Sequence, residues 1–386
     1  MNHTLVDLIA CVMAAVLLLG GISAMPVADR MAEMVPAGPR DSAGKLQAAL
    51  RVDAESRPSA EQAQAERSDQ LILSFAGDCT LGSEDYLRHT AASFISTIKE
   101  KGFDWPFSGV MEIFLSDDLT LVNLESTFTE YAKAADKSFT FRAPPAYAEI
   151  LAQGGVEAVN LANNHTMDYG WRGFEDTMAA LDAWGVAYCG HNRPGVAEAK
   201  GLNIALLGFT YPLMKSELEK LYKDIEAYRQ REDIALIVVS FHWGREMTYS
   251  PKEEQIRAAR GAIDHGADVV VGTHPHVLQP IEMYEGKPIF YSLGNFSFGG
   301  NTSPRDFDTA IMRVTYDVTP EGPKLARLEA IPCSISEKPL GTYQDFRPVA
   351  VHGNDAERVL GKLGNGAEGF PDGFFQTGLW DLRMGE

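Results

Sequence analysis

Six side chains with metal-ligating chemistry lie at or just after predicted β-strands. The set consists of Asp78, Glu125, Asn164, His242, His274 and His276. Carboxylate oxygens, an amide oxygen and imidazole nitrogens form a mixed ligand set that suits divalent ions such as Mn, Zn or Fe. A tetrahedral zinc needs three or four ligands, so this set is large enough for two ions that share a bridging carboxylate. Two such ions can activate a water molecule and stabilise an in-line displacement at phosphorus.

His165 directly follows Asn164 and is left outside this ligand set. An uncoordinated imidazole beside a metal centre can protonate a leaving group, so we predict His165 as a general acid. Three arginines, Arg142, Arg172 and Arg245, lie in the same parts of the sequence as these candidate residues. They are predicted to hold a phosphate or carboxylate group of a substrate. A surface salt bridge is the alternative for each arginine.

Each ligand also has an ordinary structural explanation when it is taken alone. Asp78 could cap a helix or form an Asx turn, Glu125 could be a surface acid, and His242 could be a hydrogen-bonded core histidine. His274 and His276 flank a proline after a Val-rich strand, where two histidines have little packing rationale. The occurrence of all these residues at strand ends favours the metal site over the separate explanations.

Short β-forming runs alternate with helical patterns from residue 71 onward. Strands are expected at 71–78, 119–125, 158–162, 203–209, 235–241, 268–271, 288–292, 310–318 and 325–331. Helices are expected at 173–184 and 252–265, where Gly185 and Gly266 supply the stop signals. This alternation predicts an α/β fold with a largely parallel or mixed sheet. Ligands of such sheets bind beyond the carboxyl ends of the strands, where the six side chains converge.

The remaining composition narrows the classes of function. The net charge of −19, from 34 basic and 53 acidic residues, opposes binding to nucleic acid and to anionic membrane surfaces. Cys79, Cys189 and Cys333 lack a CxxC spacing, so we predict buried thiols and no disulfide framework. The sequence contains no G-x-S-x-G elbow and no Walker A motif, which disfavours a serine hydrolase of that type and a P-loop enzyme.

Four segments are expected along the chain. Residues 1–24 contain an unbroken apolar run, which is typical of a signal peptide or of a retained membrane anchor. Residues 25–70 contain no aromatic residue and are predicted to form a flexible linker. Residues 71–350 form the predicted domain, and 351–386 a tail that packs on it. We therefore expect an extracytoplasmic protein that is exported or membrane-anchored.

Six short segments resemble the poly-γ-glutamate capsule biosynthesis protein family, CapA/PgsA, which is itself similar to the calcineurin-like metallophosphoesterases. They are residues 76–82, 123–125, 162–170, 242–244, 272–277 and 291–296. The resemblance implies a four-layer α/β/β/α sandwich with a dinuclear metal site. In that site Asp78 and His276 would bind one ion, Asn164, His242 and His274 the other, with Glu125 as the bridge and His165 as the general acid.

The sequence departs from the phosphoesterase pattern at two positions. The D-x-H motif reads Asp78-Cys79-Thr80, so one histidine ligand is absent, and Glu125 stands where an aspartate is usual. The resemblance implies a role in synthesis, export or anchoring of poly-γ-glutamate, with a polyglutamate synthase membrane complex as partner. The ligand would be an anionic polymer or a phosphate-containing small molecule. A phosphoesterase unrelated to capsule and a non-catalytic polymer-binding scaffold are the alternatives, so the motifs leave enzymatic activity open.

Overall fold

The computed structural model describes residues 69–210, 212 and 214–384. The predicted signal or anchor at 1–24 and nearly all of the predicted linker at 25–70 lie outside these residues. Within the described part of the chain, no helix combines the length and the apolar character that crossing a membrane requires.

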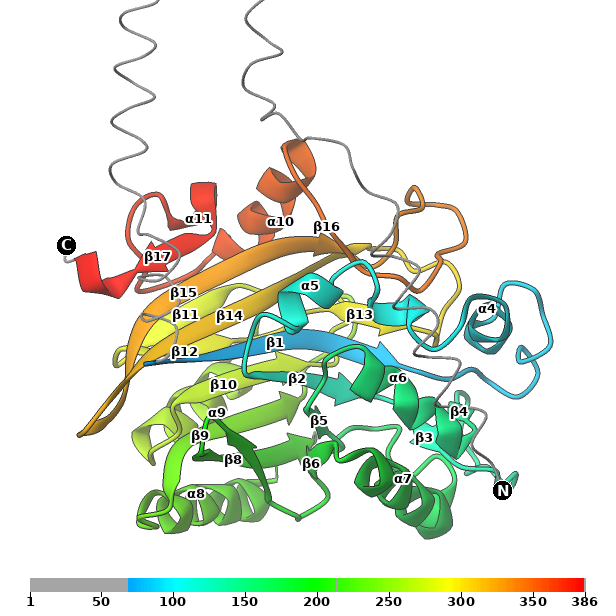
Figure 1. The fold of residues 1–386 in the computed structure, drawn as a ribbon, viewed down its shortest axis with the longest axis horizontal. Coiled ribbons are helices and arrows are strands. Elements are labelled where there is room, and N and C mark those ends of the chain that lie inside the picture. Colours follow the sequence, from blue (N-terminus) through cyan, green and yellow to red (C-terminus); the bar gives the residue numbers. More distant parts are fainter. Residues whose placement is uncertain (1–68, 211, 213, 385–386) are drawn as a thin grey trace, which may run out of the picture. The chain divides into compact units, whose positions relative to one another are not determined.

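The first of two large β-sheets contains the order β16-β15-β14-β1-β2-β5-β6 (Figure 1). Its strands are β1 (Gln70–Thr80), β2 (Leu119–Leu124), β5 (Ala158–Asn160), β6 (Ala187–Cys189), β14 (Asp308–Thr319), β15 (Gly322–Ser334) and β16 (Val349–Ala350). Two further strands join it, β13 (Asn295–Phe298) beside β1 and β17 (Leu379–Asp381) beside β15. The strands β1, β2, β5 and β6 run parallel, whereas β14 and β15 form an antiparallel pair. The sheet is therefore mixed.

The second sheet has the order β11-β12-β10-β9-β8-β7. Its strands are β7 (Gly195–Ala199), β8 (Leu202–Thr210), β9 (Ile234–His242), β10 (Val269–Thr273), β11 (Ile281–Tyr284) and β12 (Lys287–Phe290). The four inner strands run parallel, and β7 and β11 are antiparallel edges. Nearly every residue of β9 and β10 is buried, as expected for parallel strands that are covered on both faces. A separate small ladder pairs β3 (Thr127–Phe128) with β4 (Arg142–Ala143).

Helices cover the outer face of each sheet. The helices on the first sheet are α4 (Phe94–Lys101), α5 (Met111–Phe114), α6 (Glu149–Gln153) and α7 (Gly170–Trp184), with the 3-10 turns η2 (Trp105–Phe107) and η3 (Pro145–Ala148). The helices on the second sheet are α8 (Lys215–Arg229) and α9 (Glu253–Asp264). Leu121 packs between the sheets while its neighbour Val122 packs under the helices, because successive side chains of a strand point to opposite faces.

The inner faces of the two sheets share one hydrophobic core. Phe75 of β1 and Phe290 of β12 belong to it, and their ring centroids are 6.0 Å apart. Together with the two outer helical layers, this core confirms the α/β fold and its four-layer α/β/β/α arrangement.

The chain ends in α10 (Asn354–Gly364), α11 (Phe374–Thr377), β17 and the turn η4 (Leu382–Met384). Figure 1 shows α10 beside β15 and β16. Val359, Leu360 and Phe374 belong to the same core cluster as the facing strands. The predicted limit between domain and tail at residue 350 stays a prediction.

Candidate metal centre

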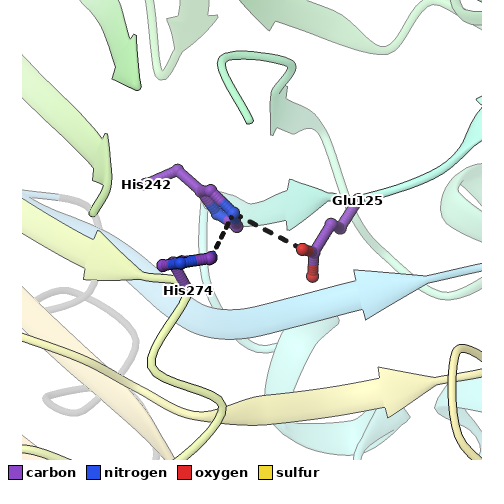
Figure 2. Close-up of side chains that lie close together, drawn as sticks. All are labelled: Glu125, His242 and His274. Carbon is purple, nitrogen blue, oxygen red and sulfur yellow. Dashed lines mark hydrogen bonds and ion pairs between the residues drawn. The ribbon is translucent and has the colours of Figure 1, made fainter. Parts of the chain in front are cut away.

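Two groups of ligand atoms lie at or just beyond the carboxyl ends of β1, β2, β9 and β10, and they share one carboxylate. One group is Glu125, His242 and His274, and the other is Asp78, Glu125 and His276. Within each group the ligand atoms lie within 4.8 Å of one another. Figure 2 shows the imidazole of His242 between Glu125 and His274. Glu125 belongs to both groups and is therefore placed where it could bridge two neighbouring candidate cation sites.

Glu125 is fully buried directly after β2. Neither of its carboxylate oxygens has a hydrogen-bond partner among the described residues. Its Oε1 lies 3.4 Å from Nε2 of His242 and 4.0 Å from Nε2 of both His165 and His276. Burial, together with the charge of Asp78, raises the pKa of Glu125. An unsatisfied buried polar group costs about 1–3 kcal/mol, and more when it is charged, so these residues fit a bound divalent cation.

Asp78 and His276 form the side of the centre nearest to β1. The backbone N–H of His274 donates to Oδ2 of Asp78 over 3.1 Å, and Nδ1 of His276 lies 3.3 Å from the same oxygen. His276 Nδ1 also lies 2.8 Å from Oδ1 of Asn295. Burial alone would lower the pKa of His276, but the charges of Glu125 and Asp78 and the contact with Asp78 raise it to about 10. Because a protonated imidazole cannot bind a metal, His276 must release a proton when an ion binds.

His242 and His274 form the other side of the centre. Nε2 of His242 lies 3.0 Å from Nδ1 of His274 and 2.7 Å from Oδ1 of Asn164. Burial is the main cause that lowers the pKa of both histidines to about 3. Both rings are therefore neutral at pH 7, which is the protonation state that binds metal.

The backbone after β10 adopts an uncommon conformation. His274 has φ 95° and His276 has φ 55°, both in the left-handed region that favours glycine. Non-glycine residues in such regions cost about 1–3 kcal/mol each and cluster at functional sites. Pro275 between them has no N–H to donate, and Met247 donates its N–H to the Pro275 carbonyl over 2.8 Å.

Buried amides beneath the centre hold its ligands in place. Asn123 donates from Nδ2 to Oδ1 of Asp78 over 2.8 Å, and its own Oδ1 accepts from Asn160 over 2.9 Å and from Asn163 over 3.3 Å. Asn123 was not among the residues predicted from the sequence to carry chemistry. The sequence clue to its role was its position in the motif segment 123–125. In the structure it is paired in register with Asp78 on the adjacent parallel strand.

A hydroxyl group orients the ring of His242. Nδ1 of His242 lies 3.1 Å from Oγ1 of Thr273, and Thr273 donates its hydroxyl to the carbonyl of Phe241 over 3.3 Å. Nδ2 of Asn123 lies 3.2 Å from the same Nδ1. Two buried side chains therefore hold the ring from this side, while Nε2 faces the centre.

His165 lies at the edge of the centre with its own carboxylate partner. Its Nδ1 is 2.8 Å from Oδ2 of the fully buried Asp168. The Asp168 carboxylate also accepts from Nζ of Lys137 over 2.7 Å, and Lys137 donates to the carbonyl of Asn164 over 2.8 Å. The ring of Phe141 packs against the imidazole with centroids 4.5 Å apart. Neither Asp168 nor Lys137 was singled out from the sequence, although Asp168 lies in the motif segment 162–170.

A pocket of about 400 Å³ opens beside the centre. Glu125, His165 and His276 line its inner end. Its other walls include the rings of Phe139, Phe141 and Phe298 and the charged side chains of Glu246, Arg305 and Asp306. The centre is therefore reachable by a ligand that has both an anionic and an apolar part.

The three arginines predicted to hold substrate do not line this pocket. Arg142 is buried, and its guanidinium donates to both oxygens of Asp85 over 2.7 and 3.1 Å. Arg172 pairs with Asp176 on the exposed face of α7 at 3.0 Å. Arg245 is exposed beside β9. Their role in substrate binding stays a prediction, and Arg305 is an arginine of the pocket wall that the sequence reasoning did not select.

The fold and the site together define a mixed α/β domain with two adjoining groups of metal-ligating side chains at the carboxyl ends of its strands. Residues 72–300 match the family described as "Bacterial capsule synthesis protein PGA_cap". The chain belongs to this family, which confirms the resemblance carried by the motif segments.

Two curated relatives extend this match. The "PGA biosynthesis protein CapA" of Bacillus subtilis (strain 168) is 33% identical over 291 residues, which cover 70% of this chain and 73% of that protein. The "Capsule biosynthesis protein CapA" of Bacillus anthracis is 30% identical over 297 residues, which cover 70% of this chain and 69% of that protein.

Among solved structures, a hypothetical protein from Thermus thermophilus aligns with a TM-score of 0.42 at 16% identity, over 68% of this chain and 98% of that chain. The four layers rest on the strand pairing and packing described above, and not on this likeness.

Proposed function

We propose that this protein serves the synthesis, export or anchoring of poly-γ-glutamate and that its candidate centre binds two divalent ions that act on a phosphate ester. Family membership and the names of the two Bacillus relatives support the first part. The observation that carries the second part is Glu125, whose two buried oxygens have no hydrogen-bond partner in the described structure while they lie between two groups of ligands.

The ligand assignment follows from the two groups. Asp78, Glu125 and His276 would hold one ion, and Glu125, His242 and His274 the other, with Asn164 close to His242. Bound Mn, Zn or Fe ions would supply Lewis acidity and a deprotonated water for attack at phosphorus.

His165 would provide the proton for the leaving group. The carboxylate of Asp168 binds Nδ1, so the ring is held with Nε2 toward the centre, 4.0 Å from Oε1 of Glu125. Lys137 offsets the charge of Asp168. This arrangement resembles the general use of a carboxylate to orient a histidine that transfers protons.

The pocket beside the centre would select the substrate. The rings of Phe139, Phe141 and Phe298 reduce the access of water to the reacting group. Arg305 is positioned in the wall to hold an anionic group of the same ligand.

The protein is further proposed to act outside the cytoplasm, either exported or membrane-anchored, together with a polyglutamate synthase membrane complex. The apolar run within residues 1–24 supports this location. Fractionation of cells that express the full-length chain tests it, since recovery only in the cytoplasm would contradict it.

Metal content of the full-length protein tests the centre. We expect about two ions per chain by inductively coupled plasma mass spectrometry, and their loss in a His274→Ala/His276→Ala variant. His89→Ala/His352→Ala, which removes two exposed histidines, is the matched control and should keep both ions. A chain that binds no metal after loading with Mn or Zn would contradict the metal centre. Bound metal without turnover of any phosphodiester would favour a non-catalytic scaffold.

A further inference from the structure

A second hollow of about 740 Å³ adjoins the pocket of the metal centre. We call it the distal groove. Arg305 and Asp306 line both hollows, so the two meet at this pair. The rest of the distal groove is formed mainly by the segment after β15, by β16 and by α10. These elements lie beyond residues 72–300, the part of the chain that matches the family.

The acids of the distal groove are already neutralised by neighbouring cations. Lys362 pairs with Asp306 at 2.6 Å and with Asp308 at 2.8 Å, and Arg358 pairs with Asp308 at 2.8 Å. Arg358 also pairs with Asp355. These side chains are therefore committed to contacts that attach α10 to the start of β14.

The acid Glu337 of the groove is neutralised by an arginine that does not line the groove. Glu337 pairs with Arg347 at 2.6 Å. Asp306 is additionally held by the hydroxyl of Tyr249, which donates to its Oδ2 over 3.0 Å. Among the described residues, no acid of the groove thus remains without a partner to repel an anionic ligand.

Two cations of the groove are not committed in this way. Arg305 and Lys338 are exposed, and the described part of the chain gives neither side chain an acidic partner. The lining carries four acids and four bases, so the groove is locally neutral in a protein of net charge −19. Leu340, 61% exposed, and the half-buried Val349 and Val351 add apolar surface to the same groove.

We propose that the distal groove binds the anionic extension of a chain whose reacting group lies at the metal centre. Arg305 would hold an anionic group where the two hollows meet, and Lys338 would hold a second one further along. The apolar surface suits methylene segments between the charges, as in γ-linked glutamate, where each unit keeps a free carboxylate. This inference deepens the proposed function and rests on it for the identity of the reacting end.

Binding of short and long oligomers tests the groove. Full-length, metal-loaded protein is titrated with γ-linked diglutamate and γ-linked octaglutamate by calorimetry. We expect the octamer to bind about tenfold more tightly than the dimer, the ratio that two exposed ion pairs provide. Arg305→Glu/Lys338→Glu should remove this advantage, and Arg305→Gln/Lys338→Gln should reduce it.

The matched control reverses the charge of one arginine and one lysine outside the groove. Arg257→Glu/Lys223→Glu changes one exposed arginine on α9 and one exposed lysine on α8, and should keep the full length dependence. The proposal is overturned if the wild-type chain binds both oligomers equally, or if the length dependence survives reversal of Arg305 and Lys338.

Two further measurements complete the test. One distinguishes a failure of the groove from a failure of the metal centre, and the other distinguishes carboxylate chains from phosphate chains as the ligand. The His274→Ala/His276→Ala variant lacks two of the proposed metal ligands. If it still binds the octamer more tightly than the dimer, and this preference depends on Arg305 and Lys338, the groove is supported independently of the metal centre. Linear polyphosphate of equal charge is titrated in parallel. Tighter binding of octaglutamate supports the assignment of the groove to carboxylate chains, and tighter binding of polyphosphate overturns it in favour of phosphate chains.

Discussion

Two buried carboxylates of this domain have opposite surroundings. Glu125 at the metal centre has no hydrogen-bond partner within the described residues, and burial raises its pKa. Asp308 at the start of β14 is 5% exposed and accepts from Arg358 over 2.8 and 2.9 Å. Burial alone would raise the pKa of Asp308 too, but the hydrogen bonds from Arg358 and Lys362 hold it below its ordinary value.

The difference separates a candidate binding site from a structural contact. The acid with partners attaches α10 to the first sheet and needs nothing further. The acid without partners is costly in the folded chain, and a cation would remove that cost. Burial alone therefore does not identify a functional carboxylate, whereas burial without a donor does point to one.

Glu125→Gln gives the largest expected change. The amide keeps the shape of the side chain but cannot bridge two cations, so the affinity for metal should fall by about a hundredfold or more. Metal content by mass spectrometry measures it. Glu246→Gln, an exposed acid in the wall of the same pocket, is the control and should keep both ions. Retention of both ions by Glu125→Gln would contradict the bridging role.

Asp168→Asn changes a third buried carboxylate, which contacts His165 and Lys137 and also accepts from the backbone N–H of Phe141 over 2.7 Å. Turnover of a phosphodiester should fall about a hundredfold because His165 loses its orienting partner, while metal content stays unchanged. Asp176→Asn on α7, which pairs with Arg172, is the matched control. Loss of metal in Asp168→Asn would show that Asp168 supports the ligands rather than His165.

Asp308→Asn should lower stability and leave the metal centre intact. Arg358 and Lys362 would lose their shared partner, and about 1–3 kcal/mol of unfolding free energy would be lost. Denaturant unfolding measures this change. Asp355→Asn removes only an exposed partner of Arg358 and should cost about 0.5 kcal/mol or less. Equal costs in the two variants would remove the distinction between the buried and the exposed acid.

The pH dependence of the metal-free protein is the smallest expected effect. A raised pKa in the folded state means that the stabilising contribution is present at low pH and is lost as the pH rises through the folded value. Glu125 and His276 both have raised pKa values. The midpoint temperature of thermal unfolding should therefore decrease as the pH is raised from about 7 to about 9. His242 and His274, whose pKa values are lowered, stay neutral in this window.

Glu125→Gln should flatten that decrease, and bound metal should reverse it because the deprotonated ligands bind the ion. Thermal unfolding in the presence and absence of a chelator measures both. A metal-free midpoint that rises over the same pH window would show that these two groups do not control the stability there.

The periodicity of the sequence predicted much of the fold. The helix expected at 173–184 is α7, which extends over Gly170–Trp184, and Gly185 follows it with φ 69° as a left-handed stop. The helix expected at 252–265 is α9, and the strand pair expected at 310–318 and 325–331 is the pair β14 and β15. These features depend on residues that are close in sequence, so local patterns are enough to predict them.

Long-range contacts were harder to predict. Asp168 was read only as part of a motif, and Lys137 gave no signal because it lies in an irregular segment that reaches His165 only in the folded chain. Residues 351–386 were expected as a tail that packs on the domain, but no helix was predicted there, and α10 places Val359 and Leu360 in the core beside strands far earlier in the sequence. Composition alone gives no information about which surface such a segment covers.

By itself the sequence determined the family, the α/β class and the set of ligand types at strand ends, because motifs and periodicity are local. Only the tertiary structure decided that Glu125 lies between the two ligand groups without a donor among the described residues, and that Arg305 rather than Arg142 lines the pocket. The physical reason is that the partners of a buried charge come from several strands and loops. Arg142 donates to Asp85, whereas Arg305 has no acidic partner among the described residues and is available to a ligand.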